Sequence, residues 1–470
     1  MARTYAGARL RRLREERRLS QAELARTLGI SPSYLNQMEH DSRPLTVPVL
    51  LKIGETFGID ASFFSARDST RLLADLREAL AAPLDEGRVL PGELEEIATR
   101  TPGAARLLLD LQRRSQRLAE QLSGRGGGPE DHQETPGSPH EEVRDFFYER
   151  RNYFHPLDLA AEDLAGELRV RPGTAGQTLA EHLEAQHGVH VATTAGPHLH
   201  RYDAASRTLH LSPRLRPGQQ TFRMAAQLAL LEYGSELDSL AAEKFPRQSP
   251  AHALTRIGLA HYFAGALVLP YREFHARAEE YRYDIERLGD HYGLGYETMC
   301  HRLSTLQRPR LSGVPLSFVR VDRAGNMSKR QSATGFPFSR SGGTCPLWNI
   351  YEAFTAPGRV HVQLTRMPDG SRHLWTARTV TRRGGAWGER GSTYAIGLGC
   401  EVRHAGRLVY SEGLDLDNPA SDTPIGMGCR VCEHLDCPQR ATPPVGHTLT
   451  IDERSSTFVP YRVRGERGRG

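Results

Sequence analysis

Three cysteines within nine positions constrain the fold of this chain most strongly. Cys429, Cys432 and Cys437 form a C-x2-C-x4-C pattern that is followed directly by Pro438. Two residues between the first pair let both sulfurs turn the same way, so three thiolates on one loop can surround a single metal centre. Such a centre needs a fourth ligand from elsewhere. The pattern therefore predicts a metal site in the C-terminal part of the chain.

Two further cysteines are candidates for the fourth ligand. Cys400 ends the segment YAIGLGC and Cys345 lies in GGTCPLW, so both follow glycines that would let the backbone approach a metal centre closely. We expect Cys400 to be the ligand, with Cys345 as the alternative and His434, inside the loop, as a lesser candidate. Cys300, in the helical segment ETMCHRL, is expected to be a small buried hydrophobe.

The identity of the metal has two candidates. Four thiolates can form a closed tetrahedral zinc site, whereas C-x4-C with a trailing proline is typical of iron–sulfur loops. The residues favour an iron–sulfur cluster over zinc. Clustered cysteines favour metal over disulfides in the reducing cytoplasm. We expect a cytoplasmic location, because the N-terminus lacks a signal-peptide segment and no apolar run reaches the roughly 18–20 residues of a membrane span.

The chain of 470 residues is too long for one small core, and its hydrophobic pattern and expected secondary structure change along its length. Short alternating or β-branched runs predict strands near 317–321, 360–364 and 393–397, and shorter strands near 189–191 and 208–211. We predict five segments: an all-α N-terminal domain at 1–66, a helical connector at 67–122, a flexible Gly/Pro/Ser-rich linker at 123–141, a mainly α middle domain at 142–310 and an α+β C-terminal domain at 311–470.

The first segment has the local signals of two short helices joined by a glycine turn. Ser20 and Glu23 form a capping box, and Gly29 ends the helix that they open. Ser31 caps a second helix with Pro32 in its first turn. Two such helices, the second with polar side chains outward, are what reading the major groove requires. The small basic excess, 61 Lys and Arg against 56 Asp and Glu, permits a nucleic-acid partner.

The segment LSQAELARTLGISPSYLNQMEHDSRPLTVPVLLKIGETFGID resembles the helix-turn-helix of the phage-repressor (XRE) class. The resemblance implies that the helix at 32–39 enters the major groove of double-stranded operator DNA, while Arg11, Arg14 and Arg43 neutralise phosphates. We expect a homodimer, because one such helix reads too few bases for useful specificity. The predicted DNA-binding residues are Gln21, Pro32, Ser33, Tyr34, Asn36, Gln37 and Arg43.

The segment TFRMAAQLALL resembles the H-E-x-x-H helix of the ImmA/IrrE-like metallopeptidases, whose histidines hold zinc and whose glutamate is the general base. Here those positions are Ala226, Gln227 and Leu230, and Leu259 stands where the family has a later glutamate ligand. The resemblance implies the fold without hydrolysis, so no catalytic residue is predicted. Apolar residues in place of the metal ligands would make the cleft that holds the peptidase site more hydrophobic, which suits an acyl chain. A domain that only dimerises the protein is the alternative.

Three C-terminal segments, SFVRVDRAGNMSKRQSATGFPFSRSGGTCPLWNIYEAF, YAIGLGCEVRHAGRLVY and MGCRVCEHLDCPQRA, are similar to the regulators of short-chain fatty acyl-CoA metabolism. The resemblance covers essentially all of the chain except the linker. It implies control of acetate, propionate or glyoxylate-pathway genes, an acyl-CoA effector and a [4Fe–4S] cluster. We predict a DNA-binding regulator and no enzyme. The alternatives are a metallopeptidase that cleaves a partner repressor and a redox sensor without a metabolite ligand. The predicted metal ligands are Cys400, Cys429, Cys432 and Cys437.

Overall fold

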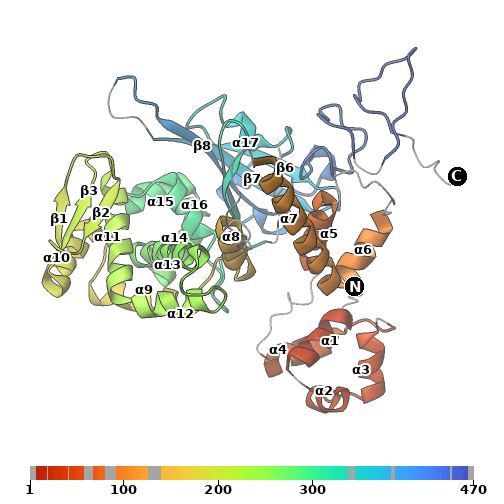
Figure 1. Ribbon diagram of the computed structural model, residues 1–470, viewed down its shortest axis with the longest axis horizontal. Coiled ribbons are helices and arrows are strands. Elements are labelled where there is room, and N and C mark those ends of the chain that lie inside the picture. The colour runs from red at the N-terminus through yellow and green to blue at the C-terminus, as the bar shows by residue number, and fades with distance from the viewer. Residues whose placement is uncertain are drawn as a thin grey trace.

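A helix-turn-helix module, a helical middle domain and a C-terminal domain with a mixed sheet follow one another in the computed structural model (Figure 1). The expected multidomain architecture is confirmed at this level. Most of the predicted linker, residues 125–138, lies outside the described residues. The structure describes residues 7–17, 19–40, 42–57, 67–79, 91–124, 139–334, 336, 338, 344–382, 387–444 and 447–463.

The N-terminal module packs its helices around a small leucine-rich core that includes Leu24, Leu35 and Met38. The capping box is present: the Ser20 hydroxyl accepts from the Glu23 N–H, and the Glu23 carboxylate accepts from the Ser20 N–H. Gly29 ends the helix with a φ of 68°, which favours glycine. The helices of the module are α1 (Gly7–Glu16), α2 (Gln21–Leu28), α3 (Pro32–Glu39) and α4 (Val47–Phe57).

A connector of helices follows, with its own core of leucines and alanines such as Leu76, Leu94 and Leu109. In Figure 1 these helices lie between the N-terminal module and the body of the protein. The connector therefore separates the module from the two larger domains. Its helices are α5 (Arg67–Ala79), α6 (Pro91–Arg100) and α7 (Pro102–Gly124).

The middle domain is built around α13 (Pro250–Val268), which is buried over most of its length and packs against the neighbouring helices. A small sheet has the order β1-β3-β2, with β1 parallel and β2 antiparallel to β3. The predicted strands near 189–191 and 208–211 correspond to β1 (His190–Thr193) and β3 (Thr208–Leu211), whereas β2 (His200–Asp203) was not predicted. The other helices are α8 (Pro139–Glu149), α9 (His155–Glu167), α10 (Ala175–His187), α11 (Pro217–Glu232), α12 (Gly234–Ala242), α14 (Tyr271–Glu280), α15 (Ile285–Tyr292) and α16 (Tyr296–Leu303).

The C-terminal domain has a six-stranded sheet in the order β5-β4-β8-β7-β6-β9. All neighbours are antiparallel except β6 and β9. The predicted strands at 317–321, 360–364 and 393–397 fall in β4, β6 and β8, whereas β7 was not predicted. The elements are β4 (Ser317–Val321), β5 (Met327–Ser332), α17 (Asn349–Glu352), β6 (His361–Arg366), β7 (Arg372–Arg382), β8 (Ser392–Glu401), α18 (Val402–Ala405), the 3-10 turns η2 (Val409–Ser411) and η3 (Pro419–Ser421), and β9 (Thr423–Pro424).

The two faces of this sheet belong to two different cores. Side chains such as Ile396 and Leu398 join the core of the helical middle domain. Side chains of the opposite face, such as Val319 and Trp375, join a second core with Trp348. Which face a residue occupies therefore decides which domain it contacts.

The helices were compared with the length and hydropathy that a membrane span requires. Within the described ranges, no helix taken alone is long and apolar enough to cross a bilayer, and only the pair α13 and α14, bent by 66°, meets those criteria together.

Candidate functional site

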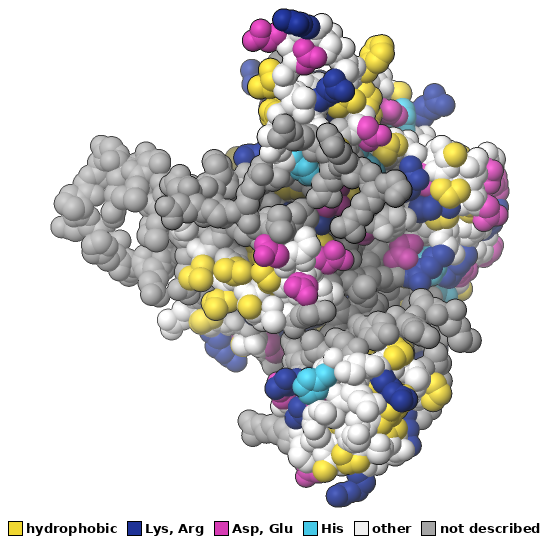
Figure 2. Space-filling model, turned by 90° about the vertical axis from the view of Figure 1, so that its right-hand side faces the viewer, with side chains coloured by type: hydrophobic (Ala, Val, Ile, Leu, Met, Phe, Trp, Pro, Cys, Tyr) yellow, Lys and Arg dark blue, Asp and Glu magenta, His cyan; other side chains and the backbone are white. Residues whose placement is uncertain are grey.

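The predicted recognition helix presents polar side chains to solvent. Ser31 caps α3 by accepting from the Tyr34 N–H, and Leu35 and Met38 face the core. Basic side chains lie at several points on the surface of the N-terminal module, at the bottom of Figure 2. The Arg43 guanidinium lies 5.7 Å from the centre of the Tyr34 ring, which is half-buried. The predicted contacts Pro32, Ser33, Asn36, Gln37 and Arg43 are all exposed.

Gln21 is bound to the recognition helix. Its side-chain amide donates to Asn36 Oδ1 at 3.2 Å and to Glu39 Oε2 at 2.7 Å. Glu39 is buried and also accepts from Arg14 Nε at 2.7 Å, a bond that raises the pKa of Arg14. Arg14, predicted as a phosphate contact, is thus paired within the module. Sequence reasoning missed Glu39, although a carboxylate at an inward-facing helix position was an available signal.

A large cleft lies between the middle and C-terminal domains. Its volume is about 1390 Å³, and it is lined from the helical side by α11, α13 and α16 and from the sheet side by β5 and β7. Three acidic residues line it, Asp290, Glu297 and Glu389. The basic side chains that line it are Arg144, Arg214, Arg216, Arg223, Arg302, Lys329, Arg330, Arg378, Arg382 and Arg390.

Cations surround the acid Glu297 at this cleft. Its carboxylate accepts from Arg320 at 2.9 Å, from Lys329 at 3.3 Å and, on the other oxygen, from Arg382 at 3.4 Å. Burial alone would raise the pKa of Glu297, but the neighbouring charges, Lys329 first, lower it overall. The carboxylate is therefore ionised, and it shares its one negative charge among three cations.

Two histidines of the cleft are neutral at physiological pH. His261 accepts a hydrogen bond of 3.2 Å from Arg223, and burial together with that charge lowers its pKa to about 3. Burial, followed by the charge of Lys329, lowers the pKa of His301 to about 3. These rings act as neutral hydrogen-bonding groups.

The degenerate peptidase positions are packed into the core. Ala226, Gln227 and Leu259 are buried, and Leu230 is half-buried against the same core. None of the four lines the cleft, which instead meets α11 one turn earlier, at Phe222 and Arg223. The prediction that these replacements line an apolar cleft is therefore wrong, because their side chains point into the helical core.

The cysteine loop meets Cys345. A small pocket is lined by Cys345 and by the three cysteines of the loop, with His434 beside them. Burial raises the pKa of Cys432 to about 11, and the nearby thiols of Cys345 and Cys437 act in the same direction. Cys300 is buried in α16, as predicted.

Cys400, the favoured fourth ligand, lies across the sheet from the loop, and this prediction is corrected. Cys400 belongs to the core of the helical domain, while Cys345 belongs to the core of the opposite face. Alternation along β8 puts Cys400 on the same side as Leu398. The preceding Gly399 leaves space on the opposite face for the Trp375 ring, not for a metal centre. Burial raises the pKa of Cys400 to about 12.

The loop geometry fits a thiolate-bound centre. The Arg440 guanidinium donates to the carbonyls of Cys429, of Cys432 at 2.7 Å and of His434 at 3.0 Å, and so closes the loop. The Ala441 N–H donates to Cys429 Sγ at 3.3 Å, the kind of bond that stabilises metal-bound thiolates. A Cβ on Gly426 would collide with Cys432 Sγ, so only glycine permits this approach.

Comparison with known proteins identifies the domains that hold these residues. Residues 10–64 match a helix-turn-helix model, residues 184–304 an IrrE N-terminal-like domain, and residues 305–461 the C-terminal domain of the short-chain fatty acyl coenzyme A regulators. The order of these domains defines a class of DNA-binding regulators with a peptidase-like domain.

Proteins that align with nearly the full length of this chain identify its family. The chain is 54% identical to the HTH-type transcriptional regulator RamB of Mycobacterium tuberculosis, over 99% of this chain and 100% of that protein. It is 41% identical to the propionyl-CoA carboxylase regulator of Cereibacter sphaeroides, over 98% of each. A solved structure of a Mycobacterium tuberculosis transcriptional regulator, 47% identical, matches 69% of this chain and 100% of that chain with a TM-score of 0.67. The chain belongs to the family of short-chain fatty acyl coenzyme A regulators, which confirms the resemblance.

Proposed function

We propose that this protein is a transcription regulator that binds operator DNA through α3 and changes its DNA affinity when a short-chain acyl-CoA occupies the cleft. The observation that carries the proposal is the charge of the cleft, which has ten basic and three acidic lining residues and stays basic even though Arg302 is paired with Asp158 and Arg378 with Glu286 outside the lining. Phosphates are bound by such clusters of arginine and lysine. The name of the Cereibacter sphaeroides relative supports the link to propionyl-CoA metabolism.

The size and the apolar part of the cleft support the same ligand. A volume of about 1390 Å³ exceeds the roughly 300–1,000 Å³ of most small-molecule sites. Coenzyme A thioesters are large and carry phosphates at one end and an acyl chain at the other. Apolar side chains that line the cleft beside the cations include Phe147, Leu215, Phe222, Leu294 and Val380.

Binding of propionyl-CoA to cleft variants tests this assignment. Arg223→Gln and Arg382→Gln each remove one cation while keeping polar volume, and each should weaken binding by about tenfold or more, since a hydrogen bond to a charged group contributes about 1.5–3 kcal/mol. Arg272→Gln is the matched control, because Arg272 is exposed and does not line the cleft. Calorimetry that gives equal affinities for all three variants would contradict the proposal.

We further propose that Cys345, Cys429, Cys432 and Cys437 hold a [4Fe–4S] cluster, which when bound supplies a redox-active and oxidation-sensitive centre. A zinc ion with Zn–S bonds of about 2.3 Å would hold its sulfurs about 3.8 Å apart. Among the described residues, no three thiol sulfurs lie within 4.8 Å of one another. The C-x4-C spacing with a trailing proline favours a cluster over zinc, the alternative.

Metal analysis of two serine variants tests the ligand set. Anaerobically purified Cys345→Ser should lose most of its iron and sulfide, whereas Cys400→Ser should keep both. Zinc in place of iron in the wild-type protein would support the alternative centre. Retention of iron by Cys345→Ser together with its loss from Cys400→Ser would reverse the assignment.

An ion pair joins the cysteine loop to the helical connector, and we propose that it carries the state of the loop toward the DNA-binding module. Arg77 of α5 lies 2.6 Å from Glu433, which is between Cys432 and Cys437. The pair is partly exposed and contributes little to stability, so its effect is expected in regulation. Glu433→Gln should reduce the difference in operator affinity between oxidised and reduced protein, as measured by fluorescence anisotropy, and an unchanged difference would exclude this route.

A homodimer is proposed through α7. Leu107, Leu108 and Leu111 are exposed by 61%, 47% and 52% and lie on one side of the helix. Exposed apolar patches of this kind mark interaction surfaces, and a second copy would supply the second recognition helix. Leu108→Glu with Leu111→Glu should give monomers in light scattering, while the control Arg106→Glu on the same helix should not. A double variant that stays dimeric would place the interface elsewhere.

A further inference from the structure

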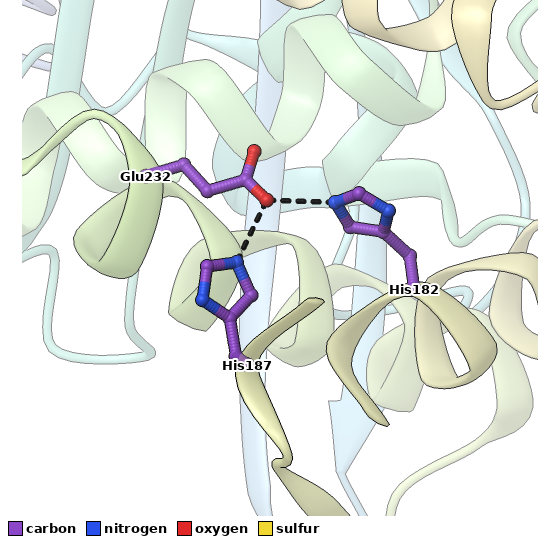
Figure 3. Close-up of side chains that lie close together, drawn as sticks. All are labelled: His182, His187 and Glu232. Atoms are coloured by element: carbon purple, nitrogen blue, oxygen red, sulfur yellow. Dashed lines mark hydrogen bonds and ion pairs between the residues drawn. The ribbon is translucent and has the colours of Figure 1, made fainter. Parts of the chain in front are cut away.

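Two histidines and a carboxylate converge in the middle domain at a place that neither the cleft nor the cysteine loop uses (Figure 3). His182 Nε2 lies 2.7 Å from Glu232 Oε1, and His187 Nε2 lies 2.8 Å from the same oxygen. The three side chains are 15%, 24% and 21% exposed. They are thus largely shielded but still within reach of a solvent ion.

The three side chains come from two helices, α10 and α11, that pack against each other. Both histidines come from the C-terminal half of α10, which ends at Gly188 with a φ of 59°. Glu232 is the last residue of α11, and α10 packs directly against α11. The group therefore joins the ends of two packed helices.

The three ligand atoms have a spacing close to that of a bound metal. They lie within 4.8 Å of one another. An ion with Zn–N and Zn–O distances of about 2.0–2.2 Å in tetrahedral geometry separates its ligand atoms by about 3.3 Å. Each imidazole already directs its Nε2 atom to Glu232 Oε1. Widening the two nitrogen–oxygen distances by about half an ångström would bring them to this separation, and small side-chain rotations would then let an ion replace the two hydrogen bonds.

The chemistry of the set selects a class of ion. Two histidines and one carboxylate bind zinc and other divalent first-row transition metals, and they leave one coordination position open for water. Mg²⁺ and Ca²⁺ prefer oxygen ligands and fit poorly.

We propose that His182, His187 and Glu232 form a site for a divalent transition-metal ion of the Zn²⁺ type that fastens the end of α10 to the end of α11. This site is separate from the lost peptidase site, whose positions Ala226 and Gln227 lie further back on α11 and are buried in the core. Because the first half of α11 lines the cleft, the ion would stabilise the helix from its opposite end.

Cobalt spectroscopy tests the site in the full-length protein without interference from the cysteines. Co²⁺ bound by nitrogen and oxygen shows d–d absorption without the thiolate charge-transfer band that cysteine-bound Co²⁺ adds. Titration of wild-type protein with Co²⁺ should give a nitrogen/oxygen-bound component. The double variant His182→Ala/His187→Ala should lose that component and bind one equivalent less zinc by elemental analysis.

Two further variants keep the test decisive. His190→Ala should retain the ion, because His190 is exposed and lies 3.6 Å from a different carboxylate, that of Glu184. Glu232→Gln keeps the side-chain shape and should weaken Zn²⁺ binding at least tenfold while circular dichroism stays unchanged. Equal zinc content and equal Co²⁺ spectra in wild-type protein and in the double histidine variant would show that the three residues form only a hydrogen-bonded cluster and would overturn the proposal.

Discussion

Asp158 is the residue whose loss we expect to destabilise the middle domain most. Its carboxylate is fully buried and accepts two hydrogen bonds of 3.0 Å from Arg302 and one of 2.5 Å from Tyr262. Arg302 is itself only 2% exposed, and Asp158 raises its pKa despite the opposing effect of burial. Asp158→Ala would therefore leave a guanidinium buried without its counter-charge.

The magnitude follows from these contacts. Removing one partner of a buried ion pair costs about 3–5 kcal/mol. Arg302 would keep its bonds of 3.1 Å to the Leu269 carbonyl and to the Thr305 hydroxyl, which limits the loss. The Tyr262 hydroxyl would lose its acceptor, which adds to it. We expect the free energy of unfolding to fall by about 4 kcal/mol for Asp158→Ala.

Urea denaturation followed by circular dichroism measures this loss, and hydrogen exchange assigns it to α9, α13 and α16. Asp163→Ala is the control, because Asp163 is exposed on the same helix and should change the free energy of unfolding by less than about 0.5 kcal/mol. Asp158→Ala/Arg302→Met should recover much of the stability, since apolar residues often replace a buried pair without cost. A loss below about 1 kcal/mol for Asp158→Ala, or a double variant no more stable than the single one, would refute the reasoning.

Three further predictions concern the other sites. The pKa of His261 and of His301 is about 3 in the folded protein, and unfolded histidine titrates near 6.5. The free energy of unfolding should therefore fall as pH drops below about 6.5, by up to about 2 kcal/mol per histidine at pH 5, and urea denaturation should show no such slope when both are glutamine. Gly426→Val should lower the iron content of anaerobic protein, because its side chain would meet Cys432 Sγ. In anisotropy titrations, Gln37→Ala should cost about 1–3 kcal/mol at the operator and relax one base position, whereas Arg43→Ala should weaken all DNA alike and reduce the salt slope by about one.

The N-terminal module was predictable because its signals are local. The capping box at Ser20, the glycine turn at Gly29 and the proline at Pro32 act within one or two helical turns, and the recognition helix spans Pro32–Glu39 as predicted. The bonds of Gln21 were not predictable, because they depend on how α2 packs against α3. The DNA contacts themselves stay predictions.

Cys400 was wrongly predicted to lie beside the cysteine loop, because its position depends on long-range strand pairing. The glycines before Cys400 suggested a close approach by a metal centre. The space at Gly399 is instead filled by Trp375 of β7, a strand that the sequence analysis did not find, and the space at Gly397 by Ile350 and Val319. Strand alternation then turns Cys400 toward the helices. Without β7 the two faces of the sheet could not be distinguished from the sequence.

The group of His182, His187 and Glu232 escaped sequence analysis for a related reason. A spacing of five residues does not put two side chains on the same line of a regular helix, so the pair does not look like the usual i, i+4 metal pair. Only the packing of α10 against α11 brings Glu232 between them. Motif searches that assume regular spacing miss such groups.

The position of the cleft bears on how the proposed effector would act. Its walls come from two domains, so a ligand held between Arg223 of α11 and Arg382 of β7 would favour the arrangement in which both contact it. The C-terminal domain also carries the cysteine loop, which is joined to the connector by the pair of Arg77 and Glu433. A coupling between a ligand and a metal centre is reciprocal by necessity. If the state of the cysteine centre changes the acyl-CoA affinity, the ligand must therefore alter that centre's equilibrium by the same factor.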